Sequence, residues 1–130
     1  MIGILLVTHG EIGKSLIDCA AHILGKSINQ LECIPIDPKS DLQECEKYIE
    51  NEIKNLDMGT GVLIMTDIYG ATPSNILKKY SSRVGYSDHS KPSESGLWAS
   101  KIALALGASN IERHYTVLNE NETKDGPVSI

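Results

Sequence analysis

The sequence of 130 residues predicts an α/β fold with an open, mostly parallel sheet and helices on both faces, a three-layer α/β/α arrangement. Residues 2–8 and 62–65 are short, continuous apolar runs, which are typical of strands buried on both faces of a parallel sheet. Segments with apolar residues at helical spacing alternate with these runs. Right-handed crossovers between such units build a parallel sheet. At this length we expect a single domain over residues 1–130.

The first strand and helix are predicted on either side of a glycine turn. Residues 2–8 form the strand, and Gly10 gives the backbone its freedom to turn. Residues 11–24 then carry apolar side chains at helical spacing, and Gly25 marks the end of the helix.

The second strand and helix carry less regular signals. Residues 31–37 form the strand, and Pro35, which has no N–H, confines that strand to an edge or a bulge. Ser40 stands three residues before Gln43, the spacing of a capping box, and so predicts the start of the next helix. That helix ends at residues 57–59.

The third strand, residues 62–65, is followed by a predicted helix to about residue 79, with Thr72 as N-cap and Pro73 at the first helical position. Beyond residue 80 the apolar patterning stops, and residues 81–96 are predicted to be a serine-rich polar loop. We expect a helix over residues 97–106, a strand over residues 114–118, and a frayed tail over residues 119–130.

Charge and composition exclude several kinds of protein. The net charge is -5 and no basic cluster exceeds the Lys78-Lys79 pair, so we expect no nucleic-acid partner. No window approaches the roughly 18 apolar residues of a membrane span, and no charged leader precedes the first strand. We therefore expect a soluble, cytoplasmic protein. The three cysteines lack C-x-x-C spacing, so neither disulfides, nor a metal site, nor another cofactor is predicted.

Two polar residues at strand ends are the candidates for chemistry. His9 follows the first apolar run and Asp67 follows the third. Because an open parallel sheet binds ligands at the carboxyl ends of its strands, both side chains could converge on one crevice. The carboxylate of Asp67 would then accept Nδ1–H of His9 and leave Nε2 as a nucleophile. The alternatives are a structural histidine and an aspartate that caps a turn.

Small residues at the starts of two helices could receive a phosphate. Gly10, Gly70 and Ala71 offer backbone N–H groups, and Thr72 adds a hydroxyl. For Thr72 alone, simple helix capping is the stronger interpretation. Tyr69 could shield the crevice. The other histidines, His22, His89 and His114, have no metal-ligand spacing.

Residues 1–80 resemble a known family. Residues 1–10, Met-Ile-Gly-Ile-Leu-Leu-Val-Thr-His-Gly, and the stretch Thr-Asp-Ile-Tyr-Gly-Ala-Thr-Pro-Ser-Asn at residues 66–75 are similar to the IIA component of the mannose-type sugar phosphotransferase system (PTS). The resemblance implies a phosphoenolpyruvate-dependent phosphocarrier, in which the protein HPr donates a phosphoryl group to His9 and His9 passes it to a IIB component. Asp67 would orient His9, and Gly70, Ala71 and Thr72 would line the phosphate site. The family also implies a homodimer that exchanges C-terminal segments.

Residues 81–130 depart from this family and are expected to be divergent or poorly ordered. The family's Gly-x-Asn-x-Pro-like segment is missing after the third helix. Natural divergence is one explanation, and a reading-frame change near residues 80–85 is the other. Two alternative functions remain: a regulatory or inactive binding module of the same fold, and a protein like the tetrapyrrole metal chelatases, since Thr-His-Gly also ends a strand there. No particular sugar is predicted.

Overall fold

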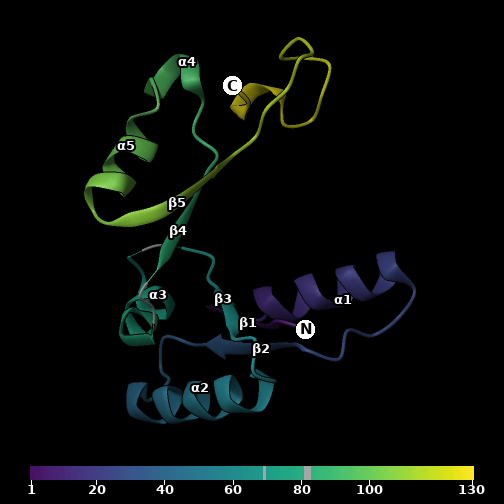
Figure 1. The fold of residues 1–130 in the computed structure, drawn as a ribbon, viewed down its shortest axis with the longest axis vertical. Helices are drawn as coiled ribbons and strands as arrows, with labels where there is room; N and C mark the ends of the chain where they lie inside the picture. Colours follow the sequence, from purple (N-terminus) through teal and green to yellow (C-terminus); the bar gives the residue numbers. More distant parts are fainter. Residues whose placement is uncertain (69, 81–82) are drawn as a thin grey trace. The chain divides into compact units, whose positions relative to one another are not determined.

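The computed structural model describes residues 1–68, 70–80 and 83–130 (Figure 1). The chain forms two compact units, residues 1–80 and residues 81–130, and each has its own sheet. The division falls after Tyr80, where the apolar patterning of the sequence ends. Among the described residues, no helix is both long enough and apolar enough to span a bilayer.

The first unit contains a three-stranded parallel sheet in the order β2-β1-β3. Its elements are β1 (Gly3–His9), α1 (Ile12–Leu24), β2 (Leu31–Ile36), α2 (Leu42–Leu56), β3 (Val62–Met65), α3 (Thr72–Leu77) and the 3₁₀ turn η1 (Lys78–Tyr80). The predicted α/β class with an open parallel sheet is confirmed. The position of Pro35 in an edge strand, β2, also agrees with the prediction.

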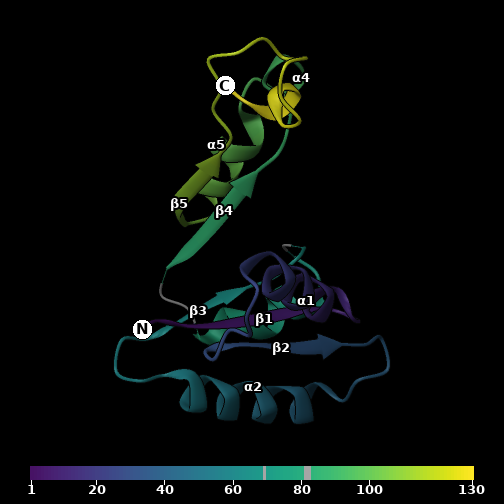
Figure 2. The same cartoon turned by 90° about the vertical axis from the view of Figure 1, so that its right-hand side faces the viewer.

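Helices cover both faces of this sheet, as predicted. Figure 2 shows α1 and α2 on opposite sides of β1 and β2. On the α2 side, one buried cluster joins the strands to α2 and α3: Leu5, Val7, Ile34, Ile36, Ile49, Leu56, Ile76 and Leu77. On the other side, α1 approaches closely at Gly13, where a Cβ atom would lie 3.0 Å from both Thr8 Oγ1 and Cys33 Cβ. Only a glycine allows this close approach without displacing its neighbours.

The ends of α1 and α2 show one confirmed prediction and one that was wrong. Gly25 adopts the left-handed conformation as the C-cap of α1, as predicted. The N-cap of α2, however, is Asp41 rather than Ser40: its carboxylate accepts hydrogen bonds from the backbone N–H of Gln43 and Glu44. Ser40 instead accepts a bond from the N–H of Asp37 at 3.0 Å, which closes the preceding turn.

Helix α3 begins one residue earlier than predicted, with Ala71 as N-cap and Thr72 as its first residue. Thr72 is therefore not the cap. The turn before the helix is held by two later side chains instead, since Ser74 Oγ accepts from Gly70 N at 2.7 Å and Asn75 Nδ2 donates to Gly70 O at 2.9 Å. These bonds fix the backbone of Gly70 in the turn, while no side chain caps the first N–H groups of the helix.

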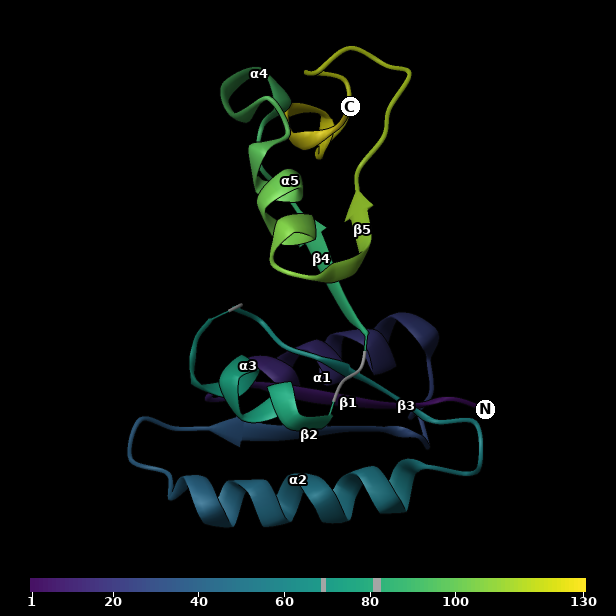
Figure 3. The same ribbon diagram turned by 60° about the vertical axis from the view of Figure 1, so that its left-hand side comes forward.

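The second unit is a βαβ arrangement (Figure 3). Its elements are β4 (Val84–Asp88), α4 (Pro92–Ser95), α5 (Trp98–Ala105), β5 (Ala108–Arg113) and the 3₁₀ turn η2 (Gly126–Val128). The predicted helix over residues 97–106 is confirmed by α5. Three other predictions were wrong: β4 and α4 lie within the expected loop, the last strand is residues 108–113 rather than 114–118, and the expected tail contains a 3₁₀ turn.

A buried ion pair explains why the strands of the second unit escaped the apolar criteria. Asp88 is fully buried at the end of β4 and pairs with Arg113 of β5, whose side chain is only 7% exposed. Ser100 of α5 donates to the same carboxylate. The residue of β4 that is buried is thus a paired aspartate and not an apolar side chain, so a hydropathy pattern does not mark the strand. Arg113 also donates to the carbonyl of Val128 at 3.2 Å, so it holds the C-terminal segment as well.

Gly3→Ala should destabilise the first unit, because a Cβ at this position would lie 2.7 Å from the carbonyl oxygen of Leu56. We expect the free energy of unfolding to fall by about 1–3 kcal/mol, the usual cost of overpacking. Urea unfolding followed by circular dichroism measures it. Gly85→Ala is the matched control, since its Cβ would have ordinary contacts at 3.7 Å. Equal stability of Gly3→Ala and wild type would contradict the packing at β1.

Asp88→Asn should destabilise the second unit by about 3–5 kcal/mol, because it leaves the buried Arg113 charge without its partner. Trp98, the one tryptophan of the chain, lies in α5 and reports unfolding by fluorescence. Glu94→Gln is the control, since Glu94 forms an exposed pair with Lys91 and should cost little.

The same carboxylate sets an acid limit for the second unit. Burial raises the pKa of Asp88, but the hydrogen bonds from Ser100 and Ser90 and the charge of Arg113 have a larger, opposite effect. The net result is a pKa well below the usual range of an aspartate. Because the folded pKa is depressed, its stabilisation is complete above about pH 4, the pKa of an unfolded aspartate, and is lost only as the pH falls toward the folded value.

Candidate functional site

His9 is the last residue of β1 and stands just before the turn into α1. Gly10 makes this turn with a positive φ of 45°. The buried hydroxyl of Thr8 accepts a hydrogen bond from the N–H of Gly13 at 2.9 Å, which ties the first turn of α1 to the strand. The His9 side chain remains 37% exposed. The strand and the hydrogen-bonded turn therefore fix the backbone of His9, while its imidazole stays accessible to solvent and to other molecules.

Asp67 lies two residues beyond the end of β3, and its side chain reaches His9. One carboxylate oxygen, Oδ2, lies 2.9 Å from Nδ1 of His9 and also accepts the backbone N–H of His9 at 3.2 Å. The other oxygen, Oδ1, accepts the N–H of Ile68 at 3.0 Å. The structure thus brings the two strand-end residues together, because β1 and β3 are neighbours and run parallel.

The proton in this contact belongs to the histidine. Burial raises the pKa of Asp67, but the hydrogen bonds from the ring and the backbone N–H of His9 outweigh that effect and hold the pKa below its ordinary value. An ionised carboxylate only accepts hydrogen bonds, so Nδ1 of His9 is the donor. In neutral imidazole the other nitrogen, Nε2, then carries a lone pair. Among the described residues, Nε2 of His9 has no hydrogen-bond partner.

The four residues expected to bind phosphate differ in what they offer. Gly10 already donates its N–H to the carbonyl of Ile36 at 3.2 Å, and Gly70 donates its N–H to Ser74 Oγ. Ala71 and Thr72 stand at the start of α3, where backbone N–H groups have no partner within the helix. Thr72 is exposed. Tyr69, a candidate for shielding the crevice or contacting a partner, lies outside the described residues.

Sequence reasoning missed Ser74 and Asn75, the two side chains that shape the turn before α3. Ser74 Oγ accepts from Gly70 N and donates to the carbonyl of Ala71 at 3.0 Å. A signal was present, since serine and asparagine in a first helical turn often bond to the preceding backbone. Ser74 is buried, so this arrangement is part of the packed unit.

A second pair of polar residues lies in the second unit. His89 follows β4 and His114 follows β5, and their Nε2 atoms are 2.9 Å apart. Nδ1 of His89 lies 3.4 Å from Ser87 Oγ, which donates to Glu112. At this distance the N–H of one imidazole donates a hydrogen bond to the bare nitrogen of the other. The strand-end criterion that selected His9 applies here too, but it failed because β4 was predicted to be loop.

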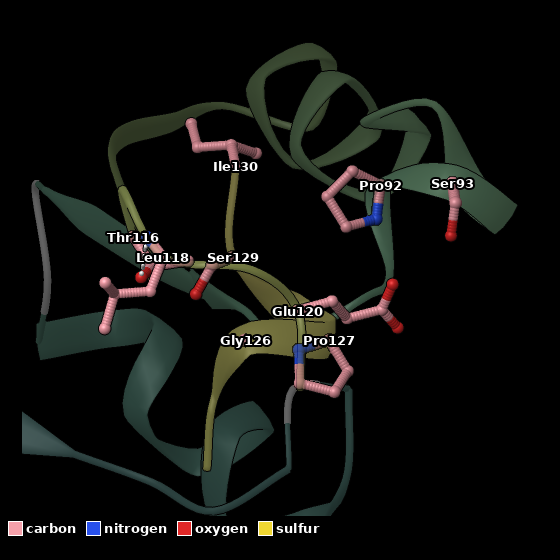
Figure 4. Close-up of a pocket in the computed structure, with 9 residues that line it drawn as sticks. All are labelled: Pro92, Ser93, Thr116, Leu118, Glu120, Gly126, Pro127, Ser129 and Ile130. Carbon is pink, nitrogen blue, oxygen red and sulfur yellow. Dashed lines mark hydrogen bonds between the residues drawn. The ribbon is translucent and has the colours of Figure 1, made fainter. Parts of the chain in front are cut away.

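The described residues contain no group of three or more His, Cys, Asp or Glu side chains that could hold a metal ion. The second unit does contain a cavity of about 280 Å³ (Figure 4). Its lining includes Thr116, Glu120, Ser129 and Ile130, and none of the predicted site residues. The volume is at the lower limit for a pocket that binds a small molecule.

The EIIA-man family model, described as PTS system fructose IIA component, matches residues 3–83. This range contains His9, Asp67 and the start of α3. Among solved structures, the chain is similar to the PTS IIA protein associated with the fucose utilization operon from Streptococcus pneumoniae, with 27% sequence identity and a TM-score of 0.55. The match covers 60% of this chain and 60% of that one, so the chain spans less than two thirds of the relative. No curated protein matches the chain at a significant level.

A second model, that of the NeuB family, matches residues 65–130. This range includes all of the second unit, and it overlaps the first match over residues 65–83. The finding argues against a reading-frame change near residues 80–85, because a segment translated out of frame would not match a family of proteins. The chain belongs to the EIIA-man family of PTS IIA components through residues 3–83, and to the NeuB family through residues 65–130.

Proposed function

We propose that the protein is a cytoplasmic histidine phosphocarrier of the phosphoenolpyruvate-dependent sugar PTS, and that His9 carries the phosphoryl group. One observation supports this most strongly: Asp67 binds Nδ1 of His9 at 2.9 Å, while Nε2 has no partner among the described residues. The exposure of the His9 side chain, 37%, suits a residue that must meet two other proteins in turn. Membership of the EIIA-man family supports the same role.

The chemistry proposed for His9 is an in-line exchange between two nitrogen atoms. The lone pair of Nε2 attacks the phosphorus of a phosphohistidine on HPr, the N–P bond of the donor breaks, and its electron pair returns to the donor imidazole. Phosphorylation leaves the His9 ring with a positive charge, which the carboxylate of Asp67 stabilises through Nδ1–H. Transfer to a IIB component repeats the exchange with His9 as the donor. Correct orientation of the ring lowers the barrier to this exchange.

We propose that the oxygens of the phosphoryl group bind at the start of α3. The N–H groups of Ala71 and Thr72 and the Thr72 hydroxyl are the donors that would meet phosphoryl oxygens. Gly70 could join them if its N–H exchanged Ser74 Oγ for a phosphoryl oxygen. Gly10 contributes differently, since its N–H bonds to Ile36 and its turn leaves space beside His9.

The proposal gives HPr and a IIB component as partners, and it assigns no sugar, because the carrier does not contact one. The solved relative is associated with a fucose utilization operon, which is a property of that protein. The function is proposed for the first unit, which contains both members of the His9–Asp67 pair.

His9→Ala should abolish phosphorylation, because it removes the accepting nitrogen. The test is incubation with phosphoenolpyruvate, enzyme I and HPr, followed by intact-mass measurement of an acid-labile phosphate. His22→Ala is the matched control: His22 is exposed in the last turn of α1 and should leave labelling unchanged. Labelling of His9→Ala to the wild-type level would remove His9 from the mechanism.

Asp67→Ala should slow phosphoryl transfer by about 100-fold, the lower end of what positioned proton-holding groups contribute. Nitrogen-15 NMR separates this effect from a structural one. Wild-type His9 should carry its proton on Nδ1, and the variant should shift toward the Nε2–H form while its amide spectrum remains that of a folded protein. An unchanged rate, or an unchanged protonation pattern of the ring, would show that Asp67 does not position His9.

A further inference from the structure

We propose that two side chains in the first turn of α3 position the carboxylate of Asp67 against His9. They are Ser74 and Asn75. Among the described residues, neither side chain bonds to the His9–Asp67 pair, and both bond to the backbone just before the helix. They therefore act on the pair through the main chain. The inference rests on the proposed phosphocarrier function for its effect on phosphoryl transfer, and on geometry alone for its effect on the His9 ring.

Asp67 lies in a short connection between β3 and α3, and both ends of this connection are held. Strand β3 ends at Met65, and the pairing of this residue with Leu6 of β1 fixes the chain two residues before Asp67. Gly70 lies three residues after Asp67. The position of the carboxylate therefore depends on how firmly Gly70 is held.

Both backbone groups of Gly70 are bound by side chains of α3. Its N–H donates to Ser74 Oγ at 2.7 Å, and its carbonyl accepts from Asn75 Nδ2 at 2.9 Å. Gly70 has a positive φ of 83°, and glycine has more backbone freedom than any other residue. The two side-chain bonds remove that freedom. We call this arrangement of Ser74 and Asn75 around Gly70 the Gly70 clamp.

The pattern of these bonds differs from helix capping. A capping side chain accepts hydrogen bonds from the first N–H groups of its own helix, and no described side chain does so in α3. Ser74 Oγ instead accepts from Gly70, before the helix, and donates to the carbonyl of Ala71 at 3.0 Å. Ser74 is only 6% exposed, and a hydrogen bond in such surroundings is stronger than in water. The clamp therefore stabilises the connection that carries Asp67.

A small shift of this connection would disrupt the contact between Asp67 and His9. Asp67 Oδ2 accepts from Nδ1 of His9 at 2.9 Å and from the His9 backbone N–H at 3.2 Å. Groups in such a constellation must be held to within about 0.5 Å of their productive geometry. The Gly70 clamp supplies this restraint. Without it, the ring loses the acceptor that keeps its proton on Nδ1.

The test compares Ser74→Ala and Asn75→Ala with wild type by NMR of the unphosphorylated full chain. The Gly70 amide should exchange with solvent about tenfold faster in Ser74→Ala, because its acceptor is gone. In both variants the His9 ring should shift from the Nδ1–H toward the Nε2–H form, while the amide spectrum remains that of a folded protein. Asn55→Ala is the matched control, since Asn55 is an exposed asparagine of α2 and should leave the His9 ring unchanged.

Phosphoryl transfer from HPr provides a second measurement. Ser74→Ala and Asn75→Ala should each slow transfer to His9 by about tenfold, the effect of losing one hydrogen bond. The loss should be smaller than in Asp67→Ala, because the carboxylate is displaced and not removed. Asn75→Gln keeps an amide donor at this exposed position and should restore most of the rate and the Nδ1–H form of the ring.

Wild-type protonation of the His9 ring in both alanine variants would overturn the proposal. An unfolded amide spectrum of Asn75→Ala would do so too, because the clamp would then stabilise the unit as a whole and not position the ring. The NMR measurements need no phosphorylation. Labelling of His9→Ala would therefore contradict the phosphocarrier proposal alone, whereas normal labelling of His9 with an unchanged ring in the variants would contradict only the Gly70 clamp.

Discussion

The hydrogen bond between the Asp67 carboxylate and Nδ1 of His9 is the interaction on which the candidate site depends. It exists because β1 and β3 are parallel neighbours whose register pairs Leu6 with Met65. Both strands therefore end at the same edge of the sheet. His9 lies three residues after Leu6, and Asp67 lies two residues after Met65. The Asp67 carboxylate, whose pKa the His9 hydrogen bonds hold below its ordinary value, accepts a hydrogen bond from the proton-bearing Nδ1 of His9 and so leaves the lone pair of the neutral ring on Nε2.

The residues behind this contact keep it in place. The buried Thr8 hydroxyl ties Gly13 and the first turn of α1 to the end of β1, and Gly13 itself permits close packing of the helix. Ser74 and Asn75 hold the turn that leads into α3. These side chains are bonded to the neighbouring backbone, whereas Nε2 of His9 has no hydrogen-bond partner among the described residues.

The second unit uses the same geometry with different support. His89 and His114 follow neighbouring parallel strands, and their Nε2 atoms meet at 2.9 Å, as the first unit brings His9 to Asp67. The residues just before them, Asp88 and Arg113, form a buried ion pair, whereas the buried residues of the first unit form an apolar cluster. Removing one member of a buried ion pair strongly destabilises a protein, because it leaves the other charge buried and unpaired. The contact between β4 and β5 therefore depends on an ion pair, which a hydropathy pattern does not reveal.

Hydropathy patterns and strand-end positions are sufficient to predict the elements of the first unit and the proximity of its two candidate site residues. Continuous apolar runs identify β1 and β3, and strand-end placement selects His9 and Asp67, because a parallel sheet brings such ends together. Pro35 and Gly25 act through their own backbone chemistry, so an edge strand and a helix end were predictable as well.

The remaining features could not be predicted, because they depend on contacts between residues far apart in the sequence or on a choice between side chains of similar chemistry. Ser40 and Asp41 both have a side-chain oxygen that can cap a helix. In the structure Asp41 caps α2, and Ser40 bonds to the preceding turn. Gly10 and Gly70 read as free donors, yet folding commits their N–H groups to Ile36 and Ser74. Strands β4 and β5 each end in a charged residue, Asp88 and Arg113, and the burial of these two side chains depends on their pairing with each other. A hydropathy pattern identifies apolar side chains that become buried. It does not identify a charged side chain whose burial is made favourable by an oppositely charged partner elsewhere in the sequence.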